Sequence, residues 1–180
     1  MPRIRLVCVL CLLAVLAAPA VSLRAATDAG LSLSPEAVST PVDTTFALEL
    51  TVDCGANADA ASLALAFDPT YLQVQSITVD AAHFPDVLRK RFDNVAGSVN
   101  YDAGSVLCHS EENCPSGLIH LASVTFRAVR RTLPSTSVSL HGQVVWAGAT
   151  TFDGAGAGST VTITSTSPAL YAISLPLVTR

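Results

Sequence analysis

Two strand patterns separated by an Asp-Pro corner limit the fold of this chain more than any other feature. Large apolar residues alternate with small ones over residues 62–67, which is typical of a half-buried strand. The Asp-Pro pair at 68–69 then interrupts the strand, because proline has no backbone N–H to donate and has a fixed φ. A β-branched segment, residues 72–79, follows at once. This arrangement predicts a β-sheet protein.

Strand patterns recur along the chain, whereas helix patterns are nearly absent. In residues 72–79 the apolar phase shifts by one after Val74, which predicts a β-bulge near Gln75 and Ser76. Only residues 85–92, which begin with a proline, are expected to form one or two helical turns. Further strands are expected at residues 31–33, 46–54, 95–106, 118–128, 137–140, 144–147 and 160–164, with a flexible glycine-rich loop at 154–158. About nine short strands between turn residues predict an antiparallel β-sandwich of the jelly-roll type.

The N-terminal segment is predicted to be a targeting sequence. Arg3 and Arg5 precede an apolar run over residues 6–18, and small residues follow, as in a secretory signal peptide. The run is shorter than the roughly 20 apolar residues that a membrane-spanning helix needs. We therefore expect a leader at 1–26, a secreted domain at 27–164 without a membrane span, and a linker with an apolar tail at 165–180.

The tail has two open interpretations. It could form a final edge strand, or it could be an export or attachment signal that holds the secreted protein at the cell surface.

The charge of the chain argues against nucleic acid as a partner. Beyond residue 26 all 14 carboxylates remain but only 7 of the 10 basic residues, which gives a net charge of −7. Nucleic-acid binding requires clustered lysines and arginines for the phosphates. The only basic clusters are at 89–91 and 130–131, and we interpret both as solvated loop charges.

Three cysteines remain after the leader is excluded. Cys108 and Cys114 enclose five residues, and an exported protein meets oxidising conditions, so we expect a disulfide between them. Cys54 continues the inward set of its strand and is expected to be a buried thiol. The odd count leaves intermolecular pairing through Cys54 as an alternative.

No catalytic or metal-binding arrangement stands out. His120 is expected on the inward phase or at the start of its strand, the other histidines in loops, and no Gly-x-Ser-x-Gly motif accompanies them. Glu49 and Asp102 are single acidic residues on solvated strand faces and not a glycosidase pair. The loop that holds Cys108, His109, Glu111, Glu112 and Cys114 has no second ligand pair at zinc-like spacing. We therefore expect a non-enzyme without cofactor or metal.

One family resemblance accounts for several of these features together. A strand, a Phe-Asp-Pro corner at 67–69, a strand that begins Leu-x-Val at 72, and then Gly-Leu-Ile and Val-Thr-Phe at 117–119 and 124–126 resemble the cohesin family. The resemblance covers roughly residues 31–163. Cohesins are extracellular β-sandwich modules related to carbohydrate-binding modules, so it implies the same fold here.

The resemblance also implies a function and a binding face. Cohesins bind dockerins, small calcium-loaded helical modules carried by enzymes, in extracellular polysaccharide degradation. The partner docks on a sheet face that includes the strand before the corner. Carried over to this chain, that face would contain Ser62, Ala64 and Ala66, with Asn100 and Asp102 on a neighbouring strand.

The face departs from the family pattern in one respect. Well-studied cohesins carry an Asn-x-Asp pair at the positions of Ala60 and Ser62, and this chain lacks it. The exposed side of the strand is small and flat instead, which suits a packed helix better than a sugar ring.

Direct binding of polysaccharide is the alternative function. A sugar platform usually presents several aromatic residues on one face, but most of the strand aromatics here fall in the apolar phase. Trp146 alternates with Val144 and is expected to be buried more readily than to form such a platform.

Overall fold

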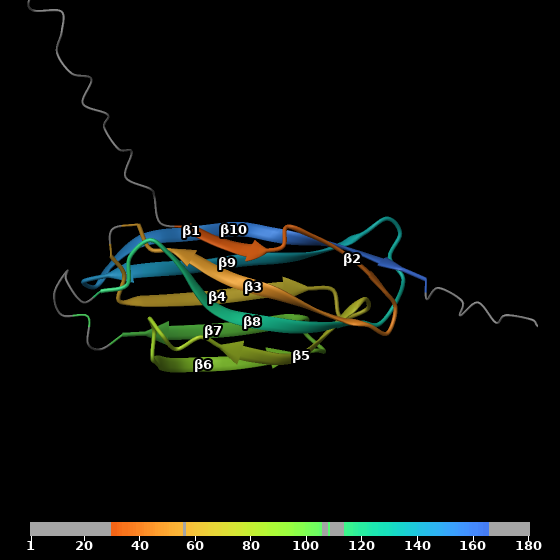
Figure 1. Ribbon diagram of the computed structural model, residues 1–180, viewed down its shortest axis with the longest axis horizontal. Helices are drawn as coiled ribbons and strands as arrows, with labels where there is room; N and C mark the ends of the chain where they lie inside the picture. The colour runs from red at the N-terminus through yellow and green to blue at the C-terminus, as the bar shows by residue number, and fades with distance from the viewer. Residues whose placement is uncertain (1–29, 56, 106–107, 109–113, 166–180) are drawn as a thin grey trace, which may run out of the picture.

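The computed structural model describes residues 30–165, apart from 56, 106–107 and 109–113. This part of the chain contains ten β-strands and no helix, so none of its segments is a helix long and apolar enough to cross a membrane. The strands run along the long axis of the molecule (Figure 1). The predicted all-β fold is confirmed, with ten strands where about nine were expected.

The strands form two sheets that share the core. The first sheet contains, in order, β5 (Leu72–Val79), β8 (Leu118–Ala128), β3 (Thr45–Asp53) and β1 (Gly30–Ser34). The second contains β10 (Ala149–Thr164), β9 (Thr136–Trp146), β4 (Ala60–Phe67), β7 (Ser98–Gly104) and β6 (Asp86–Asp93). A short strand, β2 (Ala37–Pro41), pairs in parallel with the end of β10.

The long strand β10 joins the two sheets. It pairs antiparallel with β9 in the second sheet and parallel with β1 in the first, where Ser32 lies opposite Ala157. The path of strands is therefore nearly closed, like a barrel, and ends at β5 and β6. Two parallel pairs, β1–β10 and β2–β10, accompany the predicted antiparallel arrangement.

The glycine-rich segment 154–158 belongs to β10, so the expected flexible loop was wrong. The strands expected at 137–140, 144–147 and 160–164 are likewise parts of the single long hairpin β9–β10. Gly156 explains why glycine is needed here, because a Cβ at this position would lie 2.6 Å from the carbonyl oxygen of Leu31 and 2.8 Å from Cδ2 of Leu140. The backbones approach too closely for any side chain where β10 passes from one sheet to the other.

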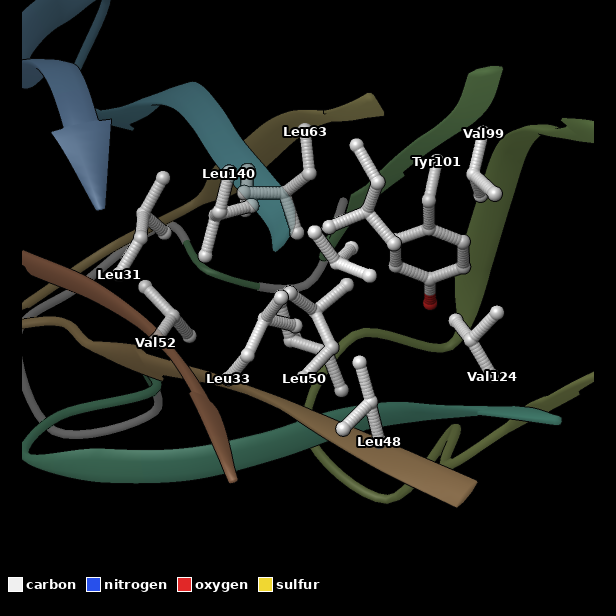
Figure 2. Packing of buried hydrophobic residues seen from close by; sticks show 14 of the residues in the cluster. Leu31, Leu33, Leu48, Leu50, Val52, Leu63, Val99, Tyr101, Val124 and Leu140 are labelled. Atoms are coloured by element: carbon white, nitrogen blue, oxygen red, sulfur yellow. The ribbon is translucent and has the colours of Figure 1, made fainter. Parts of the chain in front are cut away.

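The core lies between the sheets and is almost entirely aliphatic. Leu63 and Leu140 of the second sheet point toward Leu48 and Leu50 of the first, and the ring of Tyr101 completes the layer (Figure 2). Each of these five side chains is at most 2 % exposed. Burial of apolar surface on this scale is the main force that holds the two sheets together.

The Phe-Asp-Pro corner is anchored by aromatic packing and by a turn. The ring of Phe67 meets Phe126 edge-on at a centroid distance of 5.4 Å, and Phe126 stacks on Phe46 at 5.7 Å. Phe67 also donates its backbone N–H to the carbonyl of Gly97 at 2.9 Å. Gly97 has φ +68°, and a Cβ there would lie 2.1 Å from the carbonyl oxygen of Phe67, so only glycine fits. The corner thus fixes the turn between β6 and β7.

Two β-bulges set which residues face the core. The predicted bulge in β5 is confirmed, because the pairing with β8 shifts between Val74 and Ser76 and brings Ile77 back against the core. A second bulge in β8 was not foreseen. Leu50 lies opposite Ala122 but Thr51 lies opposite His120, which leaves Leu121 as the extra residue.

The segment 85–92 forms a strand, so the expected helical turns were wrong. Residues 86–93 make up β6, which pairs antiparallel with β7 at the end of the second sheet. Here the available partner strand overrides the local helical signal. Lys90 lies opposite the inward-facing Tyr101, and an inward-pointing charge on an edge strand discourages pairing with other chains.

A side chain closes the seam between the two end strands β5 and β6. Asn94, directly after β6, accepts a hydrogen bond from the backbone N–H of Val74 at 2.7 Å and donates its amide to the carbonyl of Val74 at 3.0 Å. The side-chain amide thereby takes the place of a neighbouring strand at this point of β5.

Replacing Gly156 should destabilise the fold. In Gly156→Val the new Cβ meets backbone and must displace β1 or β10, and such overpacking typically costs about 1–3 kcal/mol. Urea denaturation should show the loss as a lower midpoint. Gly154→Ala is the matched control, because the nearest atom to a Cβ there is Cζ of Phe152 at 3.8 Å. Equal midpoints for Gly156→Val and the wild type would contradict the tight crossing.

Candidate binding face

The predicted face residues come together on the outer side of the second sheet. Ser62 lies opposite Asp102 and Ala64 opposite Asn100 in the β4–β7 pair. Ala64 and Ala66 are exposed, whereas the other three side chains are half-buried. We call these five residues the β4–β7 face. Strict alternation along β4 directs Leu63 and Leu65 into the core and leaves only small side chains on the outer side. The centre of this face is therefore low, in the sense that its side chains extend little beyond the backbone.

Asp102 connects three strands at one end of this face. Its Oδ1 accepts hydrogen bonds from the hydroxyl of Ser62 at 2.8 Å and from Nη2 of Arg89 at 2.9 Å. Nε of Arg89 forms an ion pair with Oδ2 at 2.7 Å. The Nη2 hydrogen bond is charge-assisted, whereas Nε contributes the close ion pair without a hydrogen bond of its own, and together they hold Arg89 against Asp102. The negative charge of Asp102 is therefore neutralised within the sheet.

Sequence reasoning missed the arginines of β6 and one histidine. Arg89 and Arg91 are strand residues on the outer side, not solvated loop charges, and His141 lies on β9 opposite Ala64, not in a loop. His141 was expected in a loop because it falls between the strands predicted at 137–140 and 144–147.

A shallow hollow of about 170 Å³ lies beside the face on the β9 side. Gln143 lies opposite Ser62 and donates its amide to Oδ2 of Asp153 at 3.0 Å. The hollow is lined by Ser62, Leu63, Ala64, Arg89, His141, Gly142, Gln143 and Asp153. The larger hollow at the Phe-Asp-Pro corner, about 610 Å³, is lined by Ala66, Phe67, Asp68, Tyr71, Ser135, Thr136, Ser137 and Thr160.

A polar cluster occupies the outer side of the opposite sheet. Nε2 of His120 lies 2.6 Å from Oε2 of Glu49, and Nδ1 lies 3.4 Å from Oδ2 of Asp80. The inward position considered for His120 was wrong, because the bulge at Leu121 turns the side chain outward. The hydroxyl of Ser123 donates to Oε1 of Glu49 at 3.0 Å and not to the histidine. The cluster therefore lacks the nucleophile–base contact of a catalytic serine.

The cysteines follow the expected pattern where the structure describes them. Cys108 and Cys114 are joined by a disulfide, and Cys54 is a buried free thiol. Burial, followed by the charge of Asp53, raises the pKa of Cys54 to about 12, so the thiol is unreactive at neutral pH. His109, Glu111 and Glu112 lie outside the described residues. Within residues 30–165 less those gaps, no group of histidine, cysteine or carboxylate side chains is arranged to hold a metal ion.

Comparison with known proteins gives similarity at the level of structure. No protein-family model and no curated protein sequence matches the chain. Solved structures do match. The cohesin CaCohA2 from Clostridium acetobutylicum has a TM-score of 0.62 at 13 % identity, over 77 % of this chain and 94 % of that one. The chain has a cohesin-like fold.

Other structures with this fold come from different contexts. A non-cellulosomal cohesin from the archaeon Archaeoglobus fulgidus has a TM-score of 0.58 at 16 % identity, over 77 % of this chain and 92 % of that one. A type I cohesin–dockerin complex from Clostridium thermocellum contains a chain with a TM-score of 0.57 at 9 % identity, over 76 % and 94 % of the two chains. The jelly-roll sandwich expected from the Phe-Asp-Pro corner is thus confirmed.

The β4–β7 face of this cohesin-like domain lacks the Asn-x-Asp pair expected from the resemblance. Of Ala60 and Ser62, the two positions that the resemblance would match to an Asn-x-Asp pair, Ser62 has the polar side chain, and its hydroxyl donates to Asp102. Trp146, at the end of β9, is half-buried, so its predicted burial is met only in part.

The Asp80 carboxylate should link stability to acid pH. The backbone N–H of Ala82, and then the contact with His120, lower the pKa of Asp80 below its ordinary 3.8. A lowered pKa stabilises the fold above the unfolded value, and this contribution disappears as the pH falls through the folded value. The difference in urea midpoint between wild type and Asp80→Asn should therefore shrink as the pH falls from the unfolded pKa of Asp80 through its lower folded value.

Glu36→Gln is the control for the pH series, because the exposed Glu36 carboxylate makes no contact among the described residues. A gap between Asp80→Asn and wild type that stays the same down to pH 2 would contradict the role of the Asp80 charge.

Proposed function

We propose that this chain is an exported, non-catalytic binding module that recognises a dockerin-like protein through its β4–β7 face. The observation that carries the proposal is the composition of this face, in which exposed Ala64 and Ala66 form a low centre beside the fixed Arg89–Asp102 pair. A helix packs closely against small side chains, and a pre-ordered ion pair costs little entropy on binding. The similarity to a cohesin found in complex with a dockerin supports the same class of partner.

The histidines support a non-catalytic function. The two ring nitrogens of His120 face the carboxylates of Glu49 and Asp80, and His141 lies exposed on β9 beside the small-residue centre. Neither is held against a serine, threonine or cysteine side chain within the described part of the chain. A surface of this kind binds a partner but has no nucleophile activated by a base.

The predicted leader at 1–26 supports a function outside the cell. An exported product should lack the leader, because the apolar run has the length of a signal peptide and not of an anchor. N-terminal sequencing of the protein recovered from the culture medium should begin between about Val21 and Thr27. A product that is bound to membranes and still begins at Met1 would contradict export by this route.

Ala64→Arg should abolish capture of the protein partner. A long charged side chain at the centre of the face adds steric and desolvation costs where interfaces depend most on close packing. Folding should persist, since exposed substitutions usually change stability by no more than about 0.5 kcal/mol. The test is a pull-down of secreted proteins from the source culture with the immobilised chain, followed by mass spectrometry and measurement of affinity for the dockerin-bearing protein.

Ala47→Arg is the matched control for this experiment. Ala47 is also exposed on a strand, but on the outer side of the other sheet, opposite Thr125. Capture that survives Ala64→Arg would exclude the β4–β7 face. Retention on cellulose or chitin that is lost in Trp146→Ala but kept in Ala64→Arg would favour the polysaccharide-binding alternative.

A further inference from the structure

The three basic residues of β6 have different surroundings. Arg89 is held by Asp102. Lys90 lies opposite Tyr101 and belongs to the inward phase of the strand. Arg91 lies opposite Asn100 on the outer side, and its guanidinium has no ion pair or hydrogen bond to any of the described residues. Arg91 is thus the cation of this strand that is available to a ligand on the outer side.

Arg91 stands at a hollow of about 430 Å³ at the end of β6 and β7, which we call the β6 hollow. It is lined by Arg91, Phe92, Asp93, Asn94, Ser98 and Asn100. Within the described part of the chain, the hydroxyl of Ser98 and the side-chain amide of Asn100 also lack hydrogen-bond partners. The hollow therefore presents one charged and two neutral donors that nothing in the fold uses.

The acidic residue in the hollow, Asp93, is hydrogen-bonded to the backbone of the turn that follows it. Oδ1 of Asp93 accepts the backbone N–H groups of Val95 and Ala96 at 2.7 and 3.0 Å. These two bonds hold the pKa of Asp93 below its ordinary value. They direct the carboxylate toward the turn, and no ion pair forms between Asp93 and Arg91.

We propose that the β6 hollow receives an aspartate or glutamate side chain of the protein partner. This inference rests on the proposed function and specifies the chemistry of the partner. A guanidinium binds a carboxylate through two parallel N–H···O bonds, and the Ser98 and Asn100 donors satisfy its remaining lone pairs.

The position of the hollow fits the same docking mode. Asn100 pairs with Ala64 across the β4–β7 ladder, and Ser98 pairs with Ala66, so the hollow adjoins the low centre of the face. A partner packed over Ala64 and Ala66 would place its edge above Arg91. The chain beyond residue 26 carries a net charge of −7, so the unpaired Arg91 is a local positive site that favours an acidic over a basic side chain at close range.

A random dodecapeptide library displayed on phage tests the hollow without a known partner. Peptides selected on the full chain should be enriched in aspartate and glutamate relative to the starting library. Their affinity should fall about tenfold in Arg91→Glu, as expected when a charge contact is reversed, and this loss should shrink in high salt. Lys90→Glu is the matched control, because it makes the same charge change on the opposite side of the strand and should leave the affinity unchanged.

The outcomes separate this inference from the proposed function. Peptides without acidic enrichment, or acidic peptides that bind Arg91→Glu as well as the wild type, would overturn the β6 hollow as a carboxylate site. Partner capture that is lost in Ala64→Arg but unchanged in Arg91→Glu would also overturn it and leave the binding face standing. Capture that survives Ala64→Arg would instead overturn the proposed function, whatever the peptides show.

Discussion

The passage of β10 between the two sheets is the constraint on which the rest of the structure depends. β10 pairs with β9 and β2 on one side of the sandwich and with β1 on the other, so the two sheets are held in a fixed position relative to each other. Gly156 makes the passage possible, because the backbone of Leu31 lies where a Cβ would be. Once the positions of the two sheets are fixed, the alternation along β4 is enough to place its leucines in the core and its alanines on the outer side.

The β4–β7 face and the polar cluster around His120 differ in which of their charged side chains have a partner within the protein. On the second sheet, small residues lower the surface and Asp102 is bound by its own neighbours, which leaves Arg91 as the available charge. On the first sheet, the carboxylates of Glu49 and Asp80 both lie against the ring nitrogens of His120, so each has a partner within the protein. The sandwich thus has one outer surface with small residues beside the unpaired Arg91, and another on which Glu49, Asp80 and His120 contact one another.

Sequence reasoning succeeded where the local pattern decides the structure and failed where a distant strand decides it. Alternation located most of the strands and the bulge near Gln75 and Ser76. The resemblance to cohesins named the residues that come together in the β4–β7 pair. The outward position of His120 depends on a bulge that exists only in register with β3. Arg91 was taken for a loop charge because β6 becomes a strand only by pairing with β7. Gly156 signals a loop by composition, and its steric reason appears only once Leu31 lies beside it.

The closure of the seam by Asn94 depends on the chemical identity of its amide group. The Asn94 amide both accepts a hydrogen bond from Val74 and donates one to it, so it needs an oxygen and an NH₂ group at once. A carboxylate of the same shape keeps the acceptor but has no donor. Hydrolysis of this one amide to aspartate would therefore leave the carbonyl of Val74 facing a negative charge. The seam would loosen beside Phe92 and Arg91, at the edge of the second sheet, while the core remained intact.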